Sequence, residues 1–423
     1  MQEKAHKSET EKDVGVYVHV PFCARICPYC DFAVEPAPEL LRDPSAEAFR
    51  DREDRTVSAL IAELEARQPD FAGRRLSTLY FGGGTPGLLR ADSLARLHEA
   101  VGSAFPPALD AESELDTAVE VTLEVNPSTL ERDRLKDFAD QAGINRLSVG
   151  VQSFDDSVLK ALGRAHRADE IHRTLQAARA AGFDNLSVDL MFAVLHQTPA
   201  MLESDLQAIL AFGPEHVSTY ELVHEPGTPF GRAAEAGRLD TFDEDGAADM
   251  LLRIEAVLGG AGYERYELTN FAQPGRASRH NQRYWARQPV LAIGPGAHST
   301  DPAAPGQPFG RRVGNEKSWS AWLERIEAGR AGAPETEEIL DAGQARSEAF
   351  FLGLRTRAGV SAEAIRTEFG GGPRSFYPEA IERMVGAGLM VESVEGDLAL
   401  TGRGRLLADE VAAAFVAEEA LAR

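Results

Sequence analysis

Short apolar segments alternate with longer amphipathic ones over the first two-thirds of the chain. In residues 119–125 apolar side chains take every second position, as on one face of a strand, whereas residues 56–67 and 168–181 have helical spacing. The predicted strands are 16–20, 76–81, 119–125, 146–151, 186–191 and 217–222. Strand–helix alternation indicates parallel strands with right-handed crossovers. The sequence therefore predicts the α/β class, with a partial (β/α)6 TIM-like barrel.

Polar residues gather where these predicted strands end. A loop with all the cysteines, residues 23–30, follows the first strand, and residues 82–85 (GGGT) follow the second. Glu124, Gln152 and Asp189 lie at the ends of three later strands. Because a barrel of parallel strands carries its functional residues at the carboxyl ends of the strands, we expect one site at this edge.

The cysteine loop holds the three cysteines of the chain, Cys23, Cys27 and Cys30. An odd number of cysteines argues against a disulfide framework. Three thiolates in one loop can bind a metal and leave open one position of a four-coordinate site, or one iron of a cubane cluster. The spacing favours the iron-sulfur cluster, and a zinc site completed by an outside ligand such as His19 is the alternative.

The composition argues against a nucleic-acid-binding, membrane-spanning or exported protein. The 423 residues include 44 Lys and Arg against 67 Asp and Glu, a net charge of −23, which disfavours binding to nucleic acid. We find no apolar run long enough to span a bilayer. The polar start of the chain lacks the apolar core of a signal peptide, so we expect a disordered lead-in over residues 1–13. Free thiols without an export signal predict a cytoplasmic protein.

The last third of the chain has a different pattern. Residues 302–312 are rich in Pro and Gly and predict a linker, within a linker region that spans 301–342. Residues 343–423 predict a smaller C-terminal α+β, winged-helix-like domain, which either packs against the barrel or binds a partner. Its expected elements are helices at 343–354, 361–368, 377–387 and about 402–417, and a hairpin of 389–394 with 398–401.

The cysteine segment CARICPYCDF, residues 23–32, resembles the CxxxCxxC signature of radical S-adenosylmethionine (SAM) proteins. With the rest of residues 14–416 it resembles the oxygen-independent coproporphyrinogen III oxidase family, in its heme chaperone HemW branch. Residues 14–300 are then a radical SAM barrel with a family-specific extension. The motifs that carry the resemblance are YVHVPFC, YFGGGTP, LEVNP, GVQSF, LGRAH, EPGTP, YELTNFA, HNQRYW, GPGAHS and LTGRGRLLADEV.

The resemblance implies two bound cofactors. Cys23, Cys27 and Cys30 would ligate a [4Fe-4S] cluster, and the amino and carboxylate groups of SAM would chelate its fourth iron. The reduced cluster can then cleave SAM to a deoxyadenosyl radical. The residues that the resemblance places around SAM are Tyr17, Gly82, Gly83, Gly84, Thr85, Glu124, Gln152, Arg164 and Asp189.

These residue types suit SAM chemically. Gly82, Gly83 and Gly84 would let the backbone approach its methionine end closely, although a tight strand-to-helix turn explains them equally well. A carboxylate can hold ribose hydroxyls, and Arg164 can pair with the carboxylate of SAM.

The motif HNQRYW, residues 280–285, is associated with heme binding in the chaperone branch. The imidazole of His280 is a good axial ligand for heme iron, and Tyr284 and Trp285 can pack against the porphyrin. The alternative is that this motif fills a loop beside the barrel. His298, in GPGAHS, is more consistent with a structural role.

Two stretches depart from the family pattern. Phe32 stands where the oxidases carry a further cysteine, and only 22 residues precede Cys23, a shorter lead-in than theirs. The pattern DLxYGLPxQT after the fifth strand lacks its Gly and Pro here, so residues 193–196 are expected to form a loop of altered shape.

The sequence thus favours a heme chaperone on a [4Fe-4S]/SAM scaffold, a metal-binding protein connected with porphyrin biosynthesis. Heme and a heme-accepting protein, such as a membrane respiratory enzyme met at the membrane surface, are the expected partners. The alternative is a coproporphyrinogen III oxidase that decarboxylates its substrate to protoporphyrinogen IX. Phe32 and the HNQRYW motif disfavour that activity, and whether the chain is an enzyme stays open.

Overall fold

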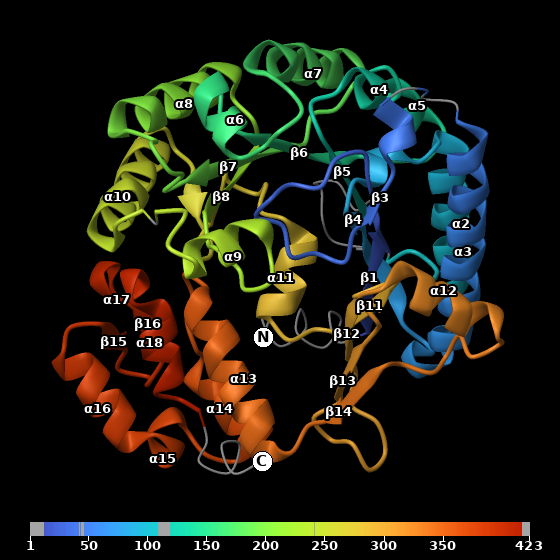
Figure 1. Cartoon of the computed structure of the whole chain (residues 1–423). Helices are drawn as coiled ribbons and strands as arrows, with labels where there is room; N and C mark the ends of the chain where they lie inside the picture. The colour runs from blue at the N-terminus through green and yellow to red at the C-terminus, as the bar shows by residue number, and fades with distance from the viewer. Residues whose placement is uncertain (1–11, 42, 44–45, 109–118, 241, 417–423) are drawn as a thin grey trace.

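The structure, a computed structural model, describes residues 12–41, 43, 46–108, 119–240 and 242–416. Six parallel strands form its centre, as the alternation predicted, and the α/β fold class is confirmed (Figure 1). Most of the predicted lead-in, residues 1–11, lies outside the described residues. The parallel strands are β1 (Asp13–Val20), β4 (Arg75–Gly83), β5 (Glu120–Val125), β6 (Arg146–Gln152), β7 (Leu186–Phe192) and β8 (His216–Glu221).

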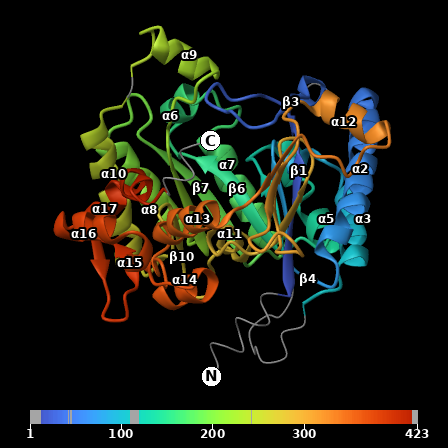
Figure 2. The ribbon, with the colours of Figure 1, turned by 90° about the horizontal axis from the view of Figure 1, so that it is seen from below.

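Helices cover the outer face of these strands (Figure 1). In α3, for example, Leu94, Leu97 and Val101 follow the helical spacing and are buried against the barrel. The longer outer helices are α2 (Glu47–Arg67), α3 (Ala91–Ala104), α7 (Ala168–Ala180), α8 (Pro199–Phe212) and α10 (Glu244–Gly260). The shorter outer helices are α4 (Thr129–Arg132) and α5 (Leu135–Asp140), whereas α6 (Asp156–Ala161) and α9 (Pro229–Glu235) lie at one end of the barrel (Figure 2).

Further strands extend the sheet on both sides of the six. On one side β11 (Val290–Ile293) pairs parallel with β1, followed by the antiparallel strands β12 (His298–Asp301), β13 (Arg311–Gly314) and β14 (Thr336–Ile339). On the other side β8 pairs with β10 (Asn270–Ala272), which pairs with β9 (Glu264–Arg265). The described sheet runs from β14 to β9 with these two strands at its edges, which is a partial barrel.

The region predicted as a linker differs from that expectation. Residues 301–342 contain β13, β14 and the helix α12 (Trp319–Glu327). Trp322 is fully buried against α2, where its Nε1 donates to Glu63 at 3.0 Å. The Pro- and Gly-rich residues 302–310 form the turn between two paired strands, because such turns use the same residues that mark linkers.

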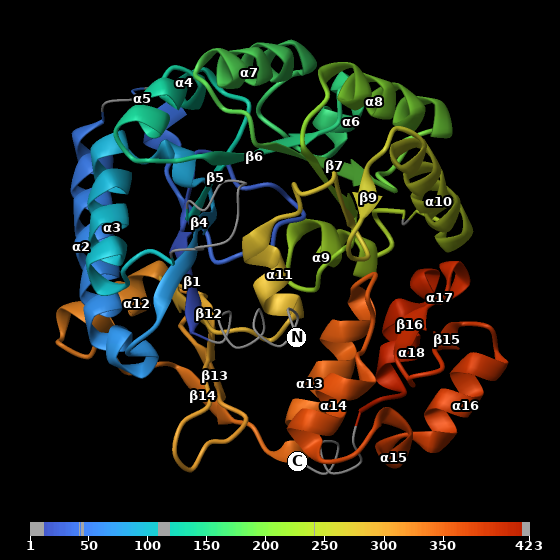
Figure 3. The ribbon, with the colours of Figure 1, turned by 180° about the vertical axis from the view of Figure 1, so that it is seen from behind.

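The helix α11 (Arg279–Trp285) lies inside the ring of strands rather than outside it (Figures 1 and 3). Arg283 fastens it to the base of the barrel by donating to Ser77 Oγ at 2.7 Å and to the Asp13 carbonyl at 2.9 Å. Gly15 leaves room for this side chain, since a Cβ there would lie 2.8 Å from Arg283 Cδ. This helix carries the whole HNQRYW motif, which begins with His280.

The C-terminal segment packs beside α10 and α11 (Figures 1 and 3). It has its own apolar core, in which Phe350 contacts Tyr377 and Phe415 with ring centroids 4.8 and 5.0 Å apart. The expected last helix is broken at Leu407 into two. The domain boundaries drawn from the sequence stay predictions. The elements of the C-terminal segment are α13 (Ala342–Arg355), α14 (Ala362–Phe369), α15 (Pro373–Phe376), α16 (Pro378–Gly386), β15 (Met390–Glu392), β16 (Leu398–Leu400), α17 (Gly402–Leu406) and α18 (Ala408–Ala413).

Candidate cofactor site

The cysteine loop closes over the carboxyl end of β1. Its two arms, β2 (Phe22–Cys23) and β3 (Glu35–Pro36), pair with each other, and β3 lies at the same end of the barrel as α6 and α9 (Figure 2). Within the loop the amide of Cys30 donates to the carbonyl of Cys27 at 3.1 Å, which makes a tight turn. The three thiols are therefore presented from one loop at the edge where the sequence predicted the site.

Burial keeps two of the thiols protonated. It raises the pKa of Cys23 to about 12, although Thr85 Oγ1, 3.6 Å from the sulfur, opposes the shift. Burial also raises the pKa of Cys30. Iron binds the thiolate, so assembly of a cluster here must release protons. As they stand, no three His, Cys, Asp or Glu side chains of the described residues form a group that could hold a metal ion, and the cysteine ligands stay a prediction.

His19, the outside ligand named for a zinc site, has both ring nitrogens in use. Nε2 lies 2.8 Å from the carbonyl of Ala33, which can only accept, so Nε2 carries the hydrogen. Nδ1 then accepts from the Tyr17 hydroxyl at 3.1 Å. Burial lowers the pKa of His19 to about 4. To ligate zinc, the ring would have to give up one of these bonds, which disfavours the zinc alternative.

The glycine run supports the cysteine loop. A Cβ on Gly83, whose φ is +108°, would lie 2.5 Å from the ring of His19, and a Cβ on Gly84 would lie 2.6 Å from the carbonyl oxygen of Pro21. The amides of Gly84 and Thr85 donate to the carbonyls of Val20 and Phe22, both at 2.8 Å. The run therefore acts as a tight turn that braces the chain leading into the loop, while its contact with SAM stays a prediction.

Two carboxylates face the barrel interior below the glycine run. Glu124 accepts from the Tyr80 hydroxyl at 2.8 Å and from the Gly83 amide at 3.1 Å, and burial raises its pKa. Asp189 accepts from Ser148 Oγ at 3.2 Å. Burial and the charge of Glu124 raise the pKa of Asp189 to about 7. Carboxylate oxygens of this kind accept hydroxyl donors such as those of a ribose.

Gln152 and Arg164 lie beside these carboxylates with unpaired polar atoms. Gln152 ends β6 with a φ of +68°, after a shift in register, and its Oε1 is buried without a partner. Arg164, after α6, donates to Cys27 Sγ at 3.4 Å and to Asn126 Oδ1, while its Nε is buried without a partner. Unpaired polar atoms beside a thiol loop and two carboxylates fit a zwitterionic ligand of the SAM type.

The loop after Asp189 forms a tight turn without the glycine of the family pattern, and its altered shape relative to the family stays a prediction. Ala193, where the family pattern has glycine, has a left-handed φ of +56°, and His196 has a φ of +66°. The Gln197 amide donates to the Val194 carbonyl at 2.8 Å and closes the turn. His196 is exposed, in agreement with the interpretation of a solvated loop histidine. Ala193 therefore bears the strain that glycine avoids.

His280 is enclosed in the barrel interior. Its Nδ1 lies 2.8 Å from Thr78 Oγ1, and its ring stacks on Tyr80 with centroids 5.1 Å apart. Tyr284 packs edge-on against it, with ring centroids 5.4 Å apart. Only 1% of the residue is exposed, and burial lowers its pKa to about 3, so the imidazole is neutral. Nε2 is buried without a partner. Trp285, in the same motif, packs under Arg355 with 5.1 Å from Cζ to the ring centroid.

Two residues that hold this site together, Asn126 and Tyr80, were not predicted as site residues from the sequence. Asn126 donates to Thr85 Oγ1 at 3.1 Å and binds Arg164, and Tyr80 holds Glu124. The period of two along 119–125 could have shown Asn126, because it continues the polar face that carries Glu124. Tyr80 gives no such signal, because the residues around it in the second strand do not alternate.

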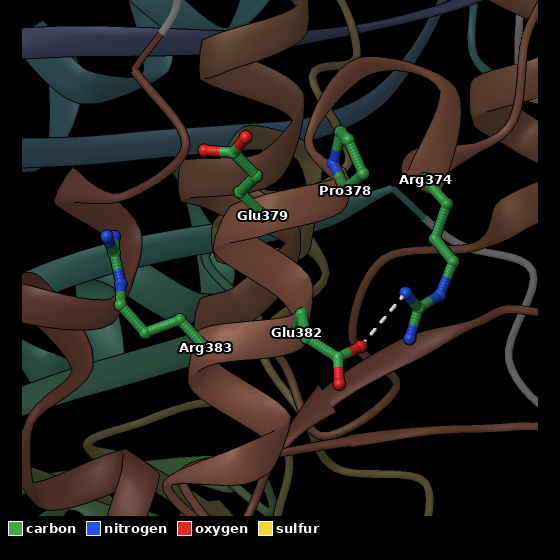
Figure 4. Close-up of a pocket in the computed structure, with 5 residues that line it drawn as sticks. All are labelled: Arg374, Pro378, Glu379, Glu382 and Arg383. Atoms are coloured by element: carbon green, nitrogen blue, oxygen red, sulfur yellow. Dashed lines mark hydrogen bonds and ion pairs between the residues drawn. The ribbon is translucent and has the colours of Figure 1, made fainter.

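A pocket of about 520 Å³ lies away from this site, on the C-terminal segment (Figure 4). All the residues that line it are exposed, and Arg374 is 3.4 Å from Glu382 and 2.6 Å from Glu392. Arg374 and Glu382 are thus already paired at the surface, and none of the predicted site residues lines the pocket. The lining residues are Arg374, Pro378, Glu379, Glu382 and Arg383.

Comparison with known families agrees with the geometry. Residues 17–209 match the radical SAM superfamily, and residues 340–407 match the HemN C-terminal domain. The first match contains the cysteine loop and the carboxyl ends of β1 to β7. Iron-sulfur and SAM binding are the properties that a radical SAM fold implies for this edge.

Relatives resemble the chain over most of its length. Heme chaperone HemW of Bacillus subtilis is 32% identical over 404 residues, 96% of this chain and 99% of that protein. Heme chaperone HemW of Escherichia coli is 34% identical over 287 residues, 67% of this chain and 69% of that protein. The solved structure of coproporphyrinogen III oxidase HemN of Escherichia coli has a TM-score of 0.77 and 23% identity, and covers 98% of this chain and 93% of that one. This structural likeness shows the fold.

Proposed function

Because the chain belongs to the heme chaperone HemW family of radical SAM proteins, we propose that it binds heme and transfers it to an acceptor protein. The observation that carries this proposal is the likeness to heme chaperone HemW of Bacillus subtilis over 96% of this chain, which includes α11 and its HNQRYW motif. We place the transfer in the cytoplasm, with a membrane respiratory enzyme as the acceptor. No helix among the described residues is long and apolar enough to cross a membrane.

Cys23, Cys27 and Cys30 would hold the [4Fe-4S] cluster, which supplies one-electron chemistry when it is bound. Arg164 would orient the carboxylate of SAM, because its guanidinium stands beside Cys27 and has an unpaired Nε. Glu124, Asp189 and Gln152 would accept or donate the hydrogen bonds of the nucleoside. The glycine run braces the chain that leads into the cysteine loop.

His280 is the residue we propose for the heme iron. Its Nδ1 is bonded to Thr78, as the other ring nitrogen of a metal-ligating histidine usually is, and its Nε2 is unpaired. Since the residue is only 1% exposed, iron can reach Nε2 only after side chains that enclose His280 move aside. Heme binding therefore includes a conformational step.

The test begins with the protein reconstituted anaerobically with iron and sulfide, to which heme is added. We expect a shift of the Soret band that His280→Ala abolishes and that the matched variant His298→Ala, at an exposed histidine, retains. We also expect bound heme to pass to an added apo-protein acceptor. A wild type that gives no Soret shift, or that converts coproporphyrinogen III to protoporphyrinogen IX with SAM, would contradict the proposal.

A further inference from the structure

Arg146, the first residue of β6, is a buried cation that makes no ion pair in direct contact. Its charge acts on Glu124 and Asp189 only across space, where it opposes the rise in their pKa. It is 2% exposed, and its one hydrogen bond is a long contact of 3.5 Å from Nη1 to Thr122 Oγ1. Its Nε is buried without a partner, and no carboxylate of the described residues lies within 4 Å as an ion pair. A guanidinium has five N–H donors, and a buried charge without compensation is expensive. Such a buried group calls for an explanation, and a bound ligand can supply one.

The carboxylates of the barrel interior are each bonded to other groups. Glu124 accepts from Tyr80 and Gly83, and Asp189 accepts from Ser148. Glu120 accepts from the first two amides of α11 at 3.1 and 3.0 Å. The fold therefore does not use these groups to neutralise Arg146 through direct contact.

Arg325 shows how this protein treats another buried arginine. It is 5% exposed, and its guanidinium contacts Glu63 at 3.1 Å and Glu316 at 2.9 Å. Asn315 Oδ1 accepts a further bond at 3.1 Å. Arg146 is therefore as buried as Arg325, but it lacks the carboxylate contacts that Arg325 makes.

The strand register places Arg146 in the same layer of the barrel as the tyrosines that contact His280. Tyr17 pairs with Tyr80, Tyr80 with Thr122, and Thr122 with Arg146 across four neighbouring strands. The ring of His280 stacks on Tyr80 and tilts against Tyr17, with centroids 5.1 and 6.3 Å apart. Two unpaired buried atoms, Nε of Arg146 and Nε2 of His280, thus belong to one layer just below Glu124.

We propose that Arg146 binds a carboxylate of the ligand that enters the barrel, namely a propionate of the heme whose iron meets His280. The inference rests on the proposed function. A guanidinium binds a carboxylate through two parallel hydrogen bonds, and in a buried site such a pair is strong. Heme offers both an iron that takes an imidazole and carboxylates that take a cation, so it matches both unpaired atoms of the layer.

The first test compares heme with heme dimethyl ester, whose propionates are uncharged. We expect the wild type to bind heme about 10- to 100-fold more tightly than the diester, the range of a charged hydrogen bond. Arg146→Met should remove this preference, because it should weaken the binding of heme and leave the binding of the diester unchanged. Arg146→Lys should keep part of the preference. The control Arg179→Met changes an arginine of α7 that pairs with Glu215 outside the interior, and it should keep the full preference.

The second test measures thermal unfolding without heme. Arg146→Met should leave the melting temperature unchanged or raise it, since an unpaired buried charge is lost, whereas Arg325→Met should lower it by stranding Glu63. If Arg146→Met lowered the melting temperature as much as Arg325→Met does, the proposal would be overturned, because Arg146 would then stabilise the fold itself.

The outcomes separate this proposal from the proposed function. If the ratio of the affinities for heme and the diester is the same in the wild type and in Arg146→Met, the proposed heme binding stands. The assignment of Arg146 to a propionate is then wrong. If the wild type binds neither compound, the heme function itself fails, and heme is not the source of the carboxylate.

Discussion

The guanidinium of Arg164 donates to the sulfur of Cys27 at 3.4 Å, across 137 residues of sequence. This contact joins the segment after α6 to the cysteine loop. It brings the residue predicted to hold SAM against a residue predicted to hold the cluster. The two cofactor sites of the sequence analysis are therefore one site in space, and a change at Arg164 tests both.

We expect Arg164→Met to weaken SAM binding about 10- to 100-fold in the reconstituted protein, because the carboxylate of SAM loses a cationic partner. Equilibrium dialysis with labelled SAM measures this directly. The matched control is Arg167→Met, three residues along the chain, where the side chain is 72% exposed and pairs with Asp156. Equal affinities for Arg164→Met and the wild type would contradict the assignment of Arg164 to SAM.

Cys23 should react as a protonated thiol in the cluster-free protein. Burial raises its pKa to about 12, so the thiolate fraction grows about tenfold per pH unit over the whole range from pH 7 to 9.5. We expect its alkylation rate, followed by mass spectrometry, to rise over this range without a plateau. The same cysteine in the unfolded chain should level off near pH 9, because a free thiol has a pKa of about 8.5. A plateau below pH 9 in the folded protein would show that Cys23 is not buried as described.

The period of two in a strand predicted on which face the polar residues lie, although Asp189 is the fourth of the seven residues of β7 and not its end. In residues 119–125 this period fixes the face on which Glu124 lies, and the parallel arrangement then carries Gln152 to the same edge. The fold class followed from the strand–helix alternation, and the radical SAM family and its heme chaperone branch followed from ordered motifs. All three are confirmed by the comparisons.

Contacts between distant segments could not be predicted in this way. The Pro- and Gly-rich composition of residues 302–312 is typical of a linker and also of a turn. Only the pairing of β12 with β13 shows that the segment is a turn. The position of α11 inside the barrel depends on Arg283 reaching Ser77 and Asp13, more than 200 residues away. The missing partner of Arg146 is likewise a property of packing, because every carboxylate near it had to be placed first.

Asp189 should make the stability of the cofactor-free protein fall as the pH rises. Its pKa is about 7 in the folded protein, against 3.8 for an ordinary aspartate, so the folded state holds a proton between these values that the unfolded state has lost. The free energy of unfolding then decreases by up to about 1.4 kcal/mol per pH unit from pH 5 to 7 through this group.

Asp189→Asn removes that contribution, and the variant serves as the reference. Urea unfolding at pH 5, 6, 7 and 8 should show the wild type losing stability relative to Asp189→Asn up to about pH 7 and then running parallel to it. A constant difference between the two proteins across this range would show that the folded carboxyl titrates near its ordinary pKa.

Trp322→Ala tests whether residues 301–342 belong to the folded barrel. Trp322 is fully buried between α12 and α2, and its Nε1 donates to the buried Glu63 at 3.0 Å. The change leaves a cavity and takes one hydrogen bond from Glu63, so we expect the free energy of unfolding to fall by about 3–5 kcal/mol. Glu324→Ala, at an exposed position of the same helix, should change it by less than about 0.5 kcal/mol. Urea unfolding of both variants gives the comparison. A loss below about 1 kcal/mol for Trp322→Ala would mean that α12 contributes little to the barrel, as the linker prediction had it.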